Sequence, residues 1–290
     1  MLASPHDKLA GDLDRATFER IRSIVHARAG IVLKDDKATL VAGRLVRRLR
    51  ELQISTAREY LRYLEADNSG EELTRLLDAM STNVTYFYRE PDHFEVIAQL
   101  HTRWIKAGQR RFRYWSAAAS SGEEPYTLAM TLHAIQSPML DLRILATDIS
   151  TAILERAIEG VYPAQAVADI PAPHLARYFT KDMSQADPHF VVGDELREMI
   201  AFRHLNLTHL PFRLSGPLDL ILCRNVMIYF DQNLRGRLVR EFARLLKPGG
   251  CLIISHAESL VGIDCELSMV RPSIYVKPNH PALAARRPPA

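Results

Sequence analysis

The 290-residue sequence predicts an α/β fold built on a parallel sheet and preceded by an all-helical domain. From residue 111 to about residue 277, apolar strand-like runs alternate with helical patterns. Such alternation is typical of a parallel sheet with helices on both faces. Residues 1–80 contain helical patterns without a convincing strand. The length allows one or two domains with a sizeable core.

The N-terminal region is expected to contain four helices. In the first, the apolar residues Phe18, Ile21 and Val25 recur at helical spacing. The fourth begins after Ser69 and Gly70. The predicted helices span residues 13–29, 36–52, 56–64 and 71–80.

The elements of the α/β region follow from apolar runs and their punctuation. Pro125 suits the start of a helix, Gly160 suits the end of one, and the Lys-Pro-Gly-Gly sequence at 247–250 should end another. The predicted strands span residues 111–119, 142–147, 199–205, 218–223, 251–255 and 273–277. The predicted helices span residues 125–135, 151–159 and 232–246.

Residues 161–198 interrupt this alternation. They contain four prolines and two short strand-like pieces, at 177–180 and 189–192, so we expect a small inserted subdomain. The expected divisions are a helical domain at 1–82, a linker and first helix at 83–110, an α/β domain at 111–278 and a flexible tail at 279–290.

The most informative local feature is the stretch RYWSAAASSGEEPYTLAM, which starts at Arg113. It predicts a strand, a tight turn at 120–122 and a helix, the unit that holds nucleotide-like ligands at the edge of a parallel sheet. It lacks both GxGxxG and GxxxxGK[ST], and Glu123 and Glu124 would repel a pyrophosphate. Acids suit a cation and hydroxyl donors. S-adenosylmethionine, which has a sulfonium, an ammonium and a ribose, is therefore predicted rather than a dinucleotide.

Composition excludes several other classes. The net charge of +3 gives no global argument for nucleic-acid binding. Cys223, Cys251 and Cys265 have no CxxC spacing, so buried free thiols in a reducing cytoplasm are expected. The sequence shows no signal peptide at Met1, and its longest uncharged stretch, 125–140, is too short to span a bilayer. The eleven histidines show no metal-binding spacing beside an acid, so no metal site is expected. A cytoplasmic protein without membrane insertion is predicted.

Six segments carry a resemblance to a known family. They are GRLVRRLREL from Gly43, MSTNVTYFYREPDHF from Met80, YWSAAASSGEEPYTLAM from Tyr114, LATDIS from Leu145, LILCRNVMIYFD from Leu220 and PSIYVK from Pro272. In this order they resemble the chemoreceptor glutamate O-methyltransferases of bacterial chemotaxis (CheR type) over nearly the whole chain. The combination of TNxTxFxRE, SAAxSxGEEPY and CRNVMIYFD is highly specific.

The resemblance implies a Rossmann-like class I methyltransferase domain with a seven-stranded, mostly parallel sheet, a helical N-terminal domain and a small inserted antiparallel β-subdomain. The implied reaction is S-adenosylmethionine-dependent methyl esterification of receptor glutamates, with S-adenosylhomocysteine as product, during adaptation in chemotaxis. The chain departs from the family pattern at Ser121, Tyr88 and Ser150. At position 150 the family usually has aspartate, so Asp148 is the only acid at that strand end.

Several residues near the predicted strand ends are candidate cofactor contacts. Asp148 suits two ribose hydroxyls, although a helix N-cap, for which Ser150 would also serve, is the alternative. Glu123, rather than Glu124, is expected to face the methionine ammonium, and the other acid would favour the positive end of the helix. Ala118 and Gly122 would let the backbone approach the ligand, or would pack strand against helix.

The resemblance adds contacts in the linker and after two further strands. It assigns Asn83, Thr85 and Arg89 to the cofactor, where the residues alone would equally suit a helix cap. It places Asn206 and Leu207 against the adenine. The full expected cofactor set is Asn83, Thr85, Arg89, Ala118, Gly122, Glu123, Asp148, Asn206, Leu207, Asn225 and Val226.

Candidate catalytic residues are Arg89, Arg224, Asn225 and Tyr229, which the resemblance places near the transferred methyl. Tyr229 could equally belong to the core, because its neighbours are apolar. Cys223 is not a candidate nucleophile, because it lies on an apolar strand with no histidine nearby in sequence.

The helix predicted at 36–52 carries a basic face. Val41, Leu45 and Leu49 share one side of it, and arginines occupy the other. A solvated surface is the simple explanation. The resemblance instead favours docking on the acidic cytoplasmic helices of a methyl-accepting chemotaxis receptor. The expected docking residues are Arg44, Arg47, Arg48 and Arg50.

Other questions stay open at this stage. The inserted subdomain would suit strand addition by a receptor C-terminal peptide, which only some family members use. A methyltransferase for RNA or a small molecule and a non-catalytic binding module are the alternative functions. The identity of the receptor, its glutamates and its pathway is not predicted, and a monomer is favoured.

Overall fold

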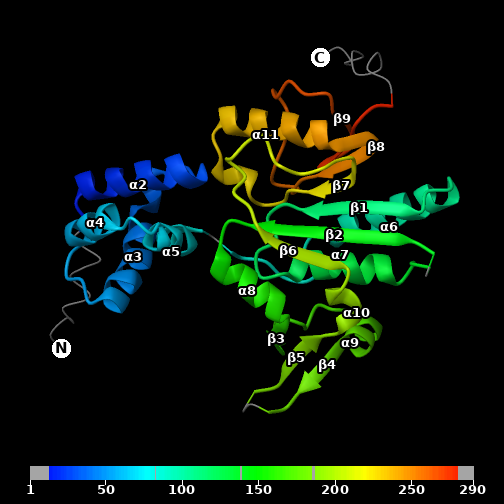
Figure 1. Cartoon of the computed structure of the whole chain (residues 1–290), viewed down its shortest axis with the longest axis horizontal. Coiled ribbons are helices and arrows are strands. Elements are labelled where there is room, and N and C mark those ends of the chain that lie inside the picture. The colour runs from blue at the N-terminus through cyan, green and yellow to red at the C-terminus, as the bar shows by residue number, and fades with distance from the viewer. Residues whose placement is uncertain (1–12, 82, 138, 185–186, 280–290) are drawn as a thin grey trace.

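The computed structural model describes residues 13–81, 83–137, 139–184 and 187–279. Figure 1 shows a helical N-terminal domain beside a layered α/β domain, with a small sheet projecting from the latter. Figure 1 also shows that the helical domain lies at one end of the large sheet. Of the expected tail at 279–290, only residue 279 lies within the described residues.

The helical domain contains the four predicted helices, with ends within three residues of those expected. They are α2 (Arg15–Ala29), α3 (Ala38–Leu52), α4 (Ala57–Ala66) and α5 (Glu71–Met80), with a short 3-10 helix, η1 (Asp35–Lys37), before α3. Asp14 caps α2, and Thr56 and Glu59 form a reciprocal capping box on α4. A single apolar core includes Ile21, Val25 and further residues of all four helices.

A buried carboxylate joins three of these helices. Glu72 of α5 is 3% exposed, and its carboxylate accepts hydrogen bonds from Tyr60 of α4 (2.7 Å) and from Arg48 of α3 (2.9 Å). Arg48 also contacts Glu51 at 2.8 Å, and its side chain is 12% exposed. A buried charge needs a partner of opposite sign. The guanidinium of Arg48 thus holds the helical domain together, which argues against the docking role predicted for it.

The α/β domain is built on the predicted seven-stranded sheet, in the order β6-β2-β1-β7-β8-β10-β9. The pairs from β6 to β8 are parallel, whereas β10 is antiparallel to both β8 and β9. The strands are β1 (Arg111–Ser116), β2 (Asp141–Asp148), β6 (Ile200–His204), β7 (Leu218–Leu222), β8 (Leu246–Ile253), β9 (Ser268–Arg271) and β10 (Ile274–Val276). Only β9 has no counterpart among the predicted strands.

Alternate residues of the central strands supply two apolar cores, one on each face. Tyr114 and Leu220 belong to the core that includes helices α6 (Pro91–Lys106) and α7 (Glu123–His133). Trp115 and Ile221 belong to the core that includes α11 (Gln232–Leu245). Helix α8 (Thr151–Glu159) follows β2. Among the described residues, no helix is long and apolar enough to cross a membrane.

Several boundaries differ from those predicted, most clearly at β8. The turn expected at 247–250 lies inside β8, where the register shifts because Leu246 pairs with Leu218 but Cys251 pairs with Leu220. Gly250 sits in this bulge, where an added Cβ would lie 2.9 Å from the carbonyl oxygen of Lys247. Within the expected linker and first helix at 83–110, the helix begins at Pro91, since the residue before a proline disfavours helical backbone angles.

The inserted subdomain is present and antiparallel, as expected. Its strands are β3 (Val161–Pro163), β4 (Phe179–Asp182) and β5 (His189–Val192), in the order β3-β5-β4. The strand predicted at 177–180 starts only at Phe179, because residues 177 and 178 end helix α9 (Ala172–Tyr178). The strand β3 and the helices α9 and α10 (Asp194–Arg197) were not predicted.

The helical domain contacts the α/β domain through the last turn of α2 and the segment that follows it. The amide of Val32 donates to the carbonyl of Tyr229 at 2.8 Å, and the Asn206 side chain donates to the carbonyl of Arg28 at 2.6 Å. Gly30 has φ +69°, and a Cβ there would lie 2.3 Å from the Leu234 side chain. Glycine at this position therefore permits the close approach of the two domains.

The free energy of unfolding should depend on pH through the buried His101. This α6 residue is fully buried, and its Nδ1 lies 2.6 Å from the Tyr114 hydroxyl. Burial lowers the pKa of His101 to about 4 from 6.5. The unfolded chain thus binds more protons than the folded one between these pH values, so stability falls as pH drops through the window. The expected loss between pH 7.5 and pH 5 is roughly 2 kcal/mol from this group.

The free energy of unfolding of wild type and His101→Gln, measured by urea unfolding at pH 7.5 and at pH 5, checks this expected loss. The variant should lose roughly 2 kcal/mol less than wild type, because glutamine can hydrogen-bond Tyr114 but does not titrate. An equal loss in the two proteins would contradict the assignment.

Candidate functional site

A cavity lies where the carboxyl ends of β1, β2, β6 and β7 meet the helical domain. It is lined by the linker before α6, by the residues that follow these four strands, and by the ends of α2 and α5. In parallel sheets, ligands bind in the crevice at this edge. The wall is formed by Ala29, Ile31, Met80, Ser81, Asn83, Val84, Thr85, Tyr86, Arg89, Phe94, Ala117, Ala118, Ser120, Glu124, Asp148, Ile149, Leu205, Asn206, Leu207, Arg224, Asn225, Val226, Tyr229 and Phe230.

Asp148 is the last residue of β2 and a buried acid on this wall. One of its carboxylate oxygens accepts the amide of Ser120 at 2.9 Å and the other accepts the amide of Ser150 at 3.0 Å. Burial raises the pKa of Asp148, although backbone hydrogen bonds oppose the rise. A carboxylate has about four acceptor positions, so both oxygens can still accept hydrogen bonds from a ligand. The N-cap of α8 is Ser150, so the alternative role for Asp148 falls away.

The turn after β1 presents Glu124, not Glu123, to the cavity. Glu124 lines the wall, whereas Glu123 and Gly122 do not. Glu123 is buried and accepts a hydrogen bond from Ser121 at 2.6 Å. Adjacent helical residues point about 100° apart, so only one of the two acids can face the cavity. This placement reverses the expected preference for Glu123.

Gly122 has a packing role in place of the expected ligand contact. Its φ is +98°, and a Cβ would lie 2.8 Å from the Tyr162 hydroxyl and 3.1 Å from Ala157. It therefore allows the turn to pack closely against α8 and β3 and to start α7. Ala118, by contrast, lies on the cavity wall.

The linker passes along the cavity, as the resemblance implied. Asn83, Thr85 and Arg89 all line it. The guanidinium of Arg89 donates to the carbonyl of Val84 at 2.7 Å and lies 5.6 Å from the ring centre of Tyr86. Arg89 thus contacts two residues of its own linker, and these contacts hold its side chain beside the cavity.

Arg224, after β7, is the most heavily bonded charged group of the site. Its side chain is 1% exposed and forms ion pairs with Glu90 (3.1 Å) and Glu124 (2.9 Å). It also donates to the carbonyl of Arg89 and lies 5.5 Å from the ring centre of Phe94. Arg224 thus joins the linker, α6 and α7 at the base of the cavity.

The turn after Arg224 is fixed by an acid that sequence reasoning missed. Glu258 is 7% exposed and accepts hydrogen bonds from the amides of Ser255 (2.8 Å), Asn225 (3.2 Å) and Ile228 (3.2 Å). Asn225 has φ +59°, and its side chain donates to Ser255 at 2.7 Å. Burial raises the pKa of Glu258 despite these hydrogen bonds. The acid therefore holds Asn225 in an uncommon backbone conformation.

The remaining predicted residues line the cavity, and two of them, Asn206 and Tyr229, also make contacts elsewhere. Asn206, Leu207, Val226 and Tyr229 line the cavity. The side-chain amide of Asn206 is already used, because it contacts Arg28 in the helical domain and accepts from Thr208 at 2.9 Å. Tyr229 packs against the apolar cores of both domains. The structure therefore supports both interpretations of Tyr229, as a residue of the acceptor pocket and as a residue of the core.

The carboxylates on the cavity wall match a small cationic ligand that carries hydroxyl groups. Two acids, the buried Asp148 and the half-buried Glu124, face a cavity whose other walls are mostly apolar. Among the residues that the structure describes there, no histidine or cysteine lines the wall. Cys223 is buried, and burial raises its thiol pKa, so it is unsuited to nucleophilic attack. The wall thus favours binding and orientation over nucleophilic chemistry by a histidine-activated or thiol group.

Loss of the Asp148 carboxylate should abolish tight ligand binding. Asp148→Asn is expected to weaken S-adenosylhomocysteine binding by at least about 100-fold, because two hydrogen bonds to a charged acceptor contribute roughly 1.5–3 kcal/mol each. Titration calorimetry measures the effect, and Glu123→Gln, outside the cavity wall, serves as the control. Wild-type affinity in Asp148→Asn would contradict the assignment.

Comparison with known proteins agrees with this geometry. Residues 83–276 match the family described as CheR methyltransferase, SAM binding domain, and residues 16–81 match CheR methyltransferase, all-alpha domain. The chain is 39% identical over 264 residues to the chemotaxis protein methyltransferase of Salmonella typhimurium, covering 91% of this chain and 90% of that protein. It is 38% identical over 262 residues to chemotaxis protein methyltransferase 2 of Pseudomonas aeruginosa, covering 90% and 92%. The chain therefore belongs to the CheR methyltransferase family and is an enzyme that uses S-adenosylmethionine as its cofactor.

Proposed function

We propose that this enzyme methylates specific glutamate side chains on the cytoplasmic helices of chemoreceptors, giving glutamate 5-O-methyl ester and S-adenosylhomocysteine during adaptation in chemotaxis. The observation that carries the proposal is the cavity at the sheet edge, with Asp148 and Glu124 on its wall and, among the described residues, no histidine or cysteine lining it. Relatives such as that of Salmonella typhimurium bear the name chemotaxis protein methyltransferase.

The cofactor assignments follow from position on the wall. Asp148 accepts the two ribose hydroxyls, because each of its oxygens retains acceptor capacity. Glu124 faces the methionine ammonium. Asn206 and Leu207 border the adenine, with Asn206 using its backbone because its side chain is engaged elsewhere. Asn83, Thr85 and Arg89 close over the cofactor from the linker.

The reaction needs no proton abstraction. The bound cofactor supplies a methyl group on a positively charged sulfur. A substrate glutamate has a reference pKa near 4.3 and is already an anion at neutral pH. The protein must therefore place the carboxylate oxygen in line with the methyl carbon and sulfur, and such orientation supplies up to about 7–11 kcal/mol.

Three residues of the wall are suited to that placement. Arg89 can pair with the incoming carboxylate, since arginine binds carboxylates through parallel hydrogen bonds. Asn225 and Tyr229 border the cavity on the turn that Glu258 fixes. Arg224 is a positioning residue, because its guanidinium is bonded to Glu90, Glu124 and the Arg89 carbonyl.

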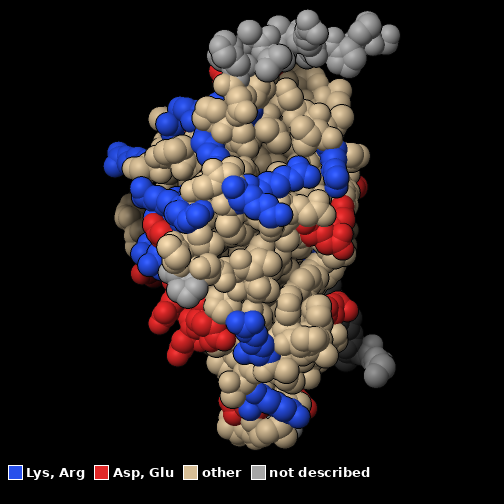
Figure 2. Space-filling view, turned by 90° about the vertical axis from the view of Figure 1, so that its right-hand side faces the viewer, with Lys and Arg blue, Asp and Glu red and all other residues tan. Residues whose placement is uncertain are grey.

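The basic face of α3 is the proposed docking surface for the receptor. The Arg47 side chain is 87% exposed and Arg50 is also exposed. Arg44 donates to the carbonyl of Met80 at 2.7 Å, so α3 is tied directly to the cavity wall. Basic residues also gather on the face opposite the helical domain (Figure 2). Positive charge alone therefore does not single out one docking surface. The position of α3 beside the cavity is what supports it as the docking surface.

A second receptor contact is proposed at the inserted subdomain. Strand β4 forms one edge of the three-stranded sheet, and two of its four residues, Thr180 and Lys181, are exposed. Extended peptides bind such edges by adding a strand. A C-terminal receptor peptide is the partner proposed for this edge.

The chemical identity of the product tests the proposed function. Enzyme, tritium-labelled S-adenosylmethionine and a receptor cytoplasmic fragment should give labelled receptor, and mild alkali should release the label as methanol. A carboxyl ester hydrolyses under these conditions, whereas an N-methyl group does not. Label that survives alkali, or receptor that stays unlabelled, would contradict the proposal.

Charge reversal tests the docking surface. The double variant Arg47→Glu/Arg50→Glu should lower the receptor methylation rate at least tenfold while S-adenosylhomocysteine affinity stays unchanged, because neither residue lines the cavity. Arg237→Glu/Arg240→Glu, on exposed positions of α11, makes the same change in net charge as a control. Equal rates for both double variants would refute docking through α3.

A further inference from the structure

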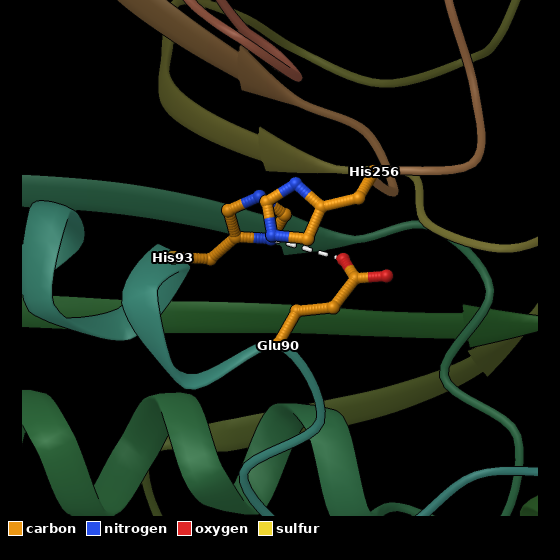
Figure 3. Close-up of side chains that lie close together, drawn as sticks. All are labelled: Glu90, His93 and His256. Atoms are coloured by element: carbon orange, nitrogen blue, oxygen red, sulfur yellow. Dashed lines mark ion pairs between the residues drawn. The ribbon is translucent and has the colours of Figure 1, made fainter.

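Three potential metal ligands meet just outside the cavity wall. Glu90 ends the linker, His93 lies in the first turn of α6, and His256 follows β8 (Figure 3). One donor atom from each lies within 4.8 Å of the others. The spacing of histidines along the sequence gives no hint of this site, because His256 is 163 positions beyond His93.

The buried ring of His93 lacks a hydrogen-bond partner on one side. Its Nε2 lies 2.7 Å from the Ser273 hydroxyl, which donates its own proton to the carbonyl of Pro272. In the tautomer of His93 that donates from Nε2 to Ser273, Nδ1 carries a lone pair. That Nδ1 is buried without a hydrogen-bond partner and lies 3.3 Å from a carboxylate oxygen of Glu90. In that tautomer two electron-rich atoms face each other, an arrangement that a cation relieves; Figure 3 marks this pair with a dashed line.

The distance between these atoms suits zinc. Bonds of about 2.0–2.1 Å at a tetrahedral angle place two donor atoms about 3.3–3.4 Å apart. The observed separation between His93 Nδ1 and Glu90 Oε2 is 3.3 Å. Two imidazoles and one carboxylate also match the nitrogen and oxygen ligands that Zn²⁺ prefers.

Both histidines have the outer contacts typical of metal ligands. Ser273 holds Nε2 of His93, and Asp92 lies 3.1 Å from Nε2 of His256. Such contacts fix the ring and its tautomer and leave the other nitrogen for the metal. The weak contact of His256 Nδ1 with Ser273, at 3.2 Å, would be given up. The His256 side chain is 44% exposed, so it can turn toward the site.

The local charge also accommodates a divalent ion. Arg224 lies 3.1 Å from Glu90, but it shares its charge with Glu124 at 2.9 Å. Asp92, which contacts His256, adds a third carboxylate to this region. Asp92 and His256 also line a surface hollow together with Glu95 and Arg271, which gives an ion a route to the site.

We propose that Glu90, His93 and His256 bind one Zn²⁺ ion, with water in the remaining position. The ion connects the start of α6 to the segment after β8 and so stabilises the protein around the linker. This site goes beyond the proposed methyl transfer, and its binding can be measured without turnover.

Zinc titration of tag-free, metal-depleted protein by calorimetry tests the proposal. Wild type should bind one Zn²⁺ per chain. His256→Ala should bind at least tenfold more weakly, and Asp92→Asn about tenfold more weakly, because loss of an outer contact typically costs 10–100-fold. His209→Ala, at an exposed histidine elsewhere, and Cys265→Ser should bind as wild type does. No stoichiometric binding, or wild-type affinity in His256→Ala, overturns the proposal.

Thermal unfolding supplies an independent measurement. At free Zn²⁺ about 100 times the dissociation constant, the midpoint of wild type should rise by roughly 5 °C. At the same Zn²⁺ concentration the midpoint of His256→Ala should rise by at most about half as much, because RT ln(1 + [L]/Kd) falls with tenfold weaker binding. Because neither measurement uses methyl transfer, an inactive enzyme that binds zinc would refute the proposed function and leave the metal site standing. A midpoint that rises equally in both proteins refutes the site.

Discussion

The buried guanidinium of Arg224 is the interaction on which the arrangement of the site depends. A charge that is 1% exposed is costly unless it is paired, and its partners come from separate segments: Glu90 and the Arg89 carbonyl from the linker, and Glu124 from α7. The linker therefore cannot leave the sheet without exposing this charge or leaving it unpaired. The same ion pairs hold Glu124 at the cavity wall, so cofactor recognition and linker position are parts of one network.

The two domains are joined in a comparable way. Gly30 permits backbone contact where any side chain would clash with Leu234, and Tyr229 packs against the cores of both domains. The cavity wall combines residues of α2 and α5 with residues of the α/β domain. The cofactor pocket is therefore complete only when the helical domain is docked, and α3 is held at a fixed place relative to the cavity.

Local pattern predicted the elements and the residues that end strands, but not the contacts between distant segments. Asp148 and Asn225 follow apolar runs, so their positions at the sheet edge could be inferred. Glu90, Ser255 and Glu258 gave no comparable signal, because the contact of Glu90 with Ser255 joins residues 165 positions apart. The same limit explains why the sequence grouped Arg48 with the exposed arginines of α3. It resembles Arg47 in the sequence, but its partner Glu72 lies on α5. Glu123 and Glu124 could not be separated until the start of α7 fixed the direction of each.

A transfer that needs no base places its demands on geometry alone. Asn225 shows how this geometry is maintained: its positive φ would be unfavourable in a free chain, and three backbone amides bound to Glu258 compensate within the fold. The acid lies outside the cavity wall, yet it determines where Asn225 and Tyr229 stand. The residues with the greatest influence on the reaction are thus expected to include some that never touch the substrate, and these are the residues that a search for catalytic side chains overlooks.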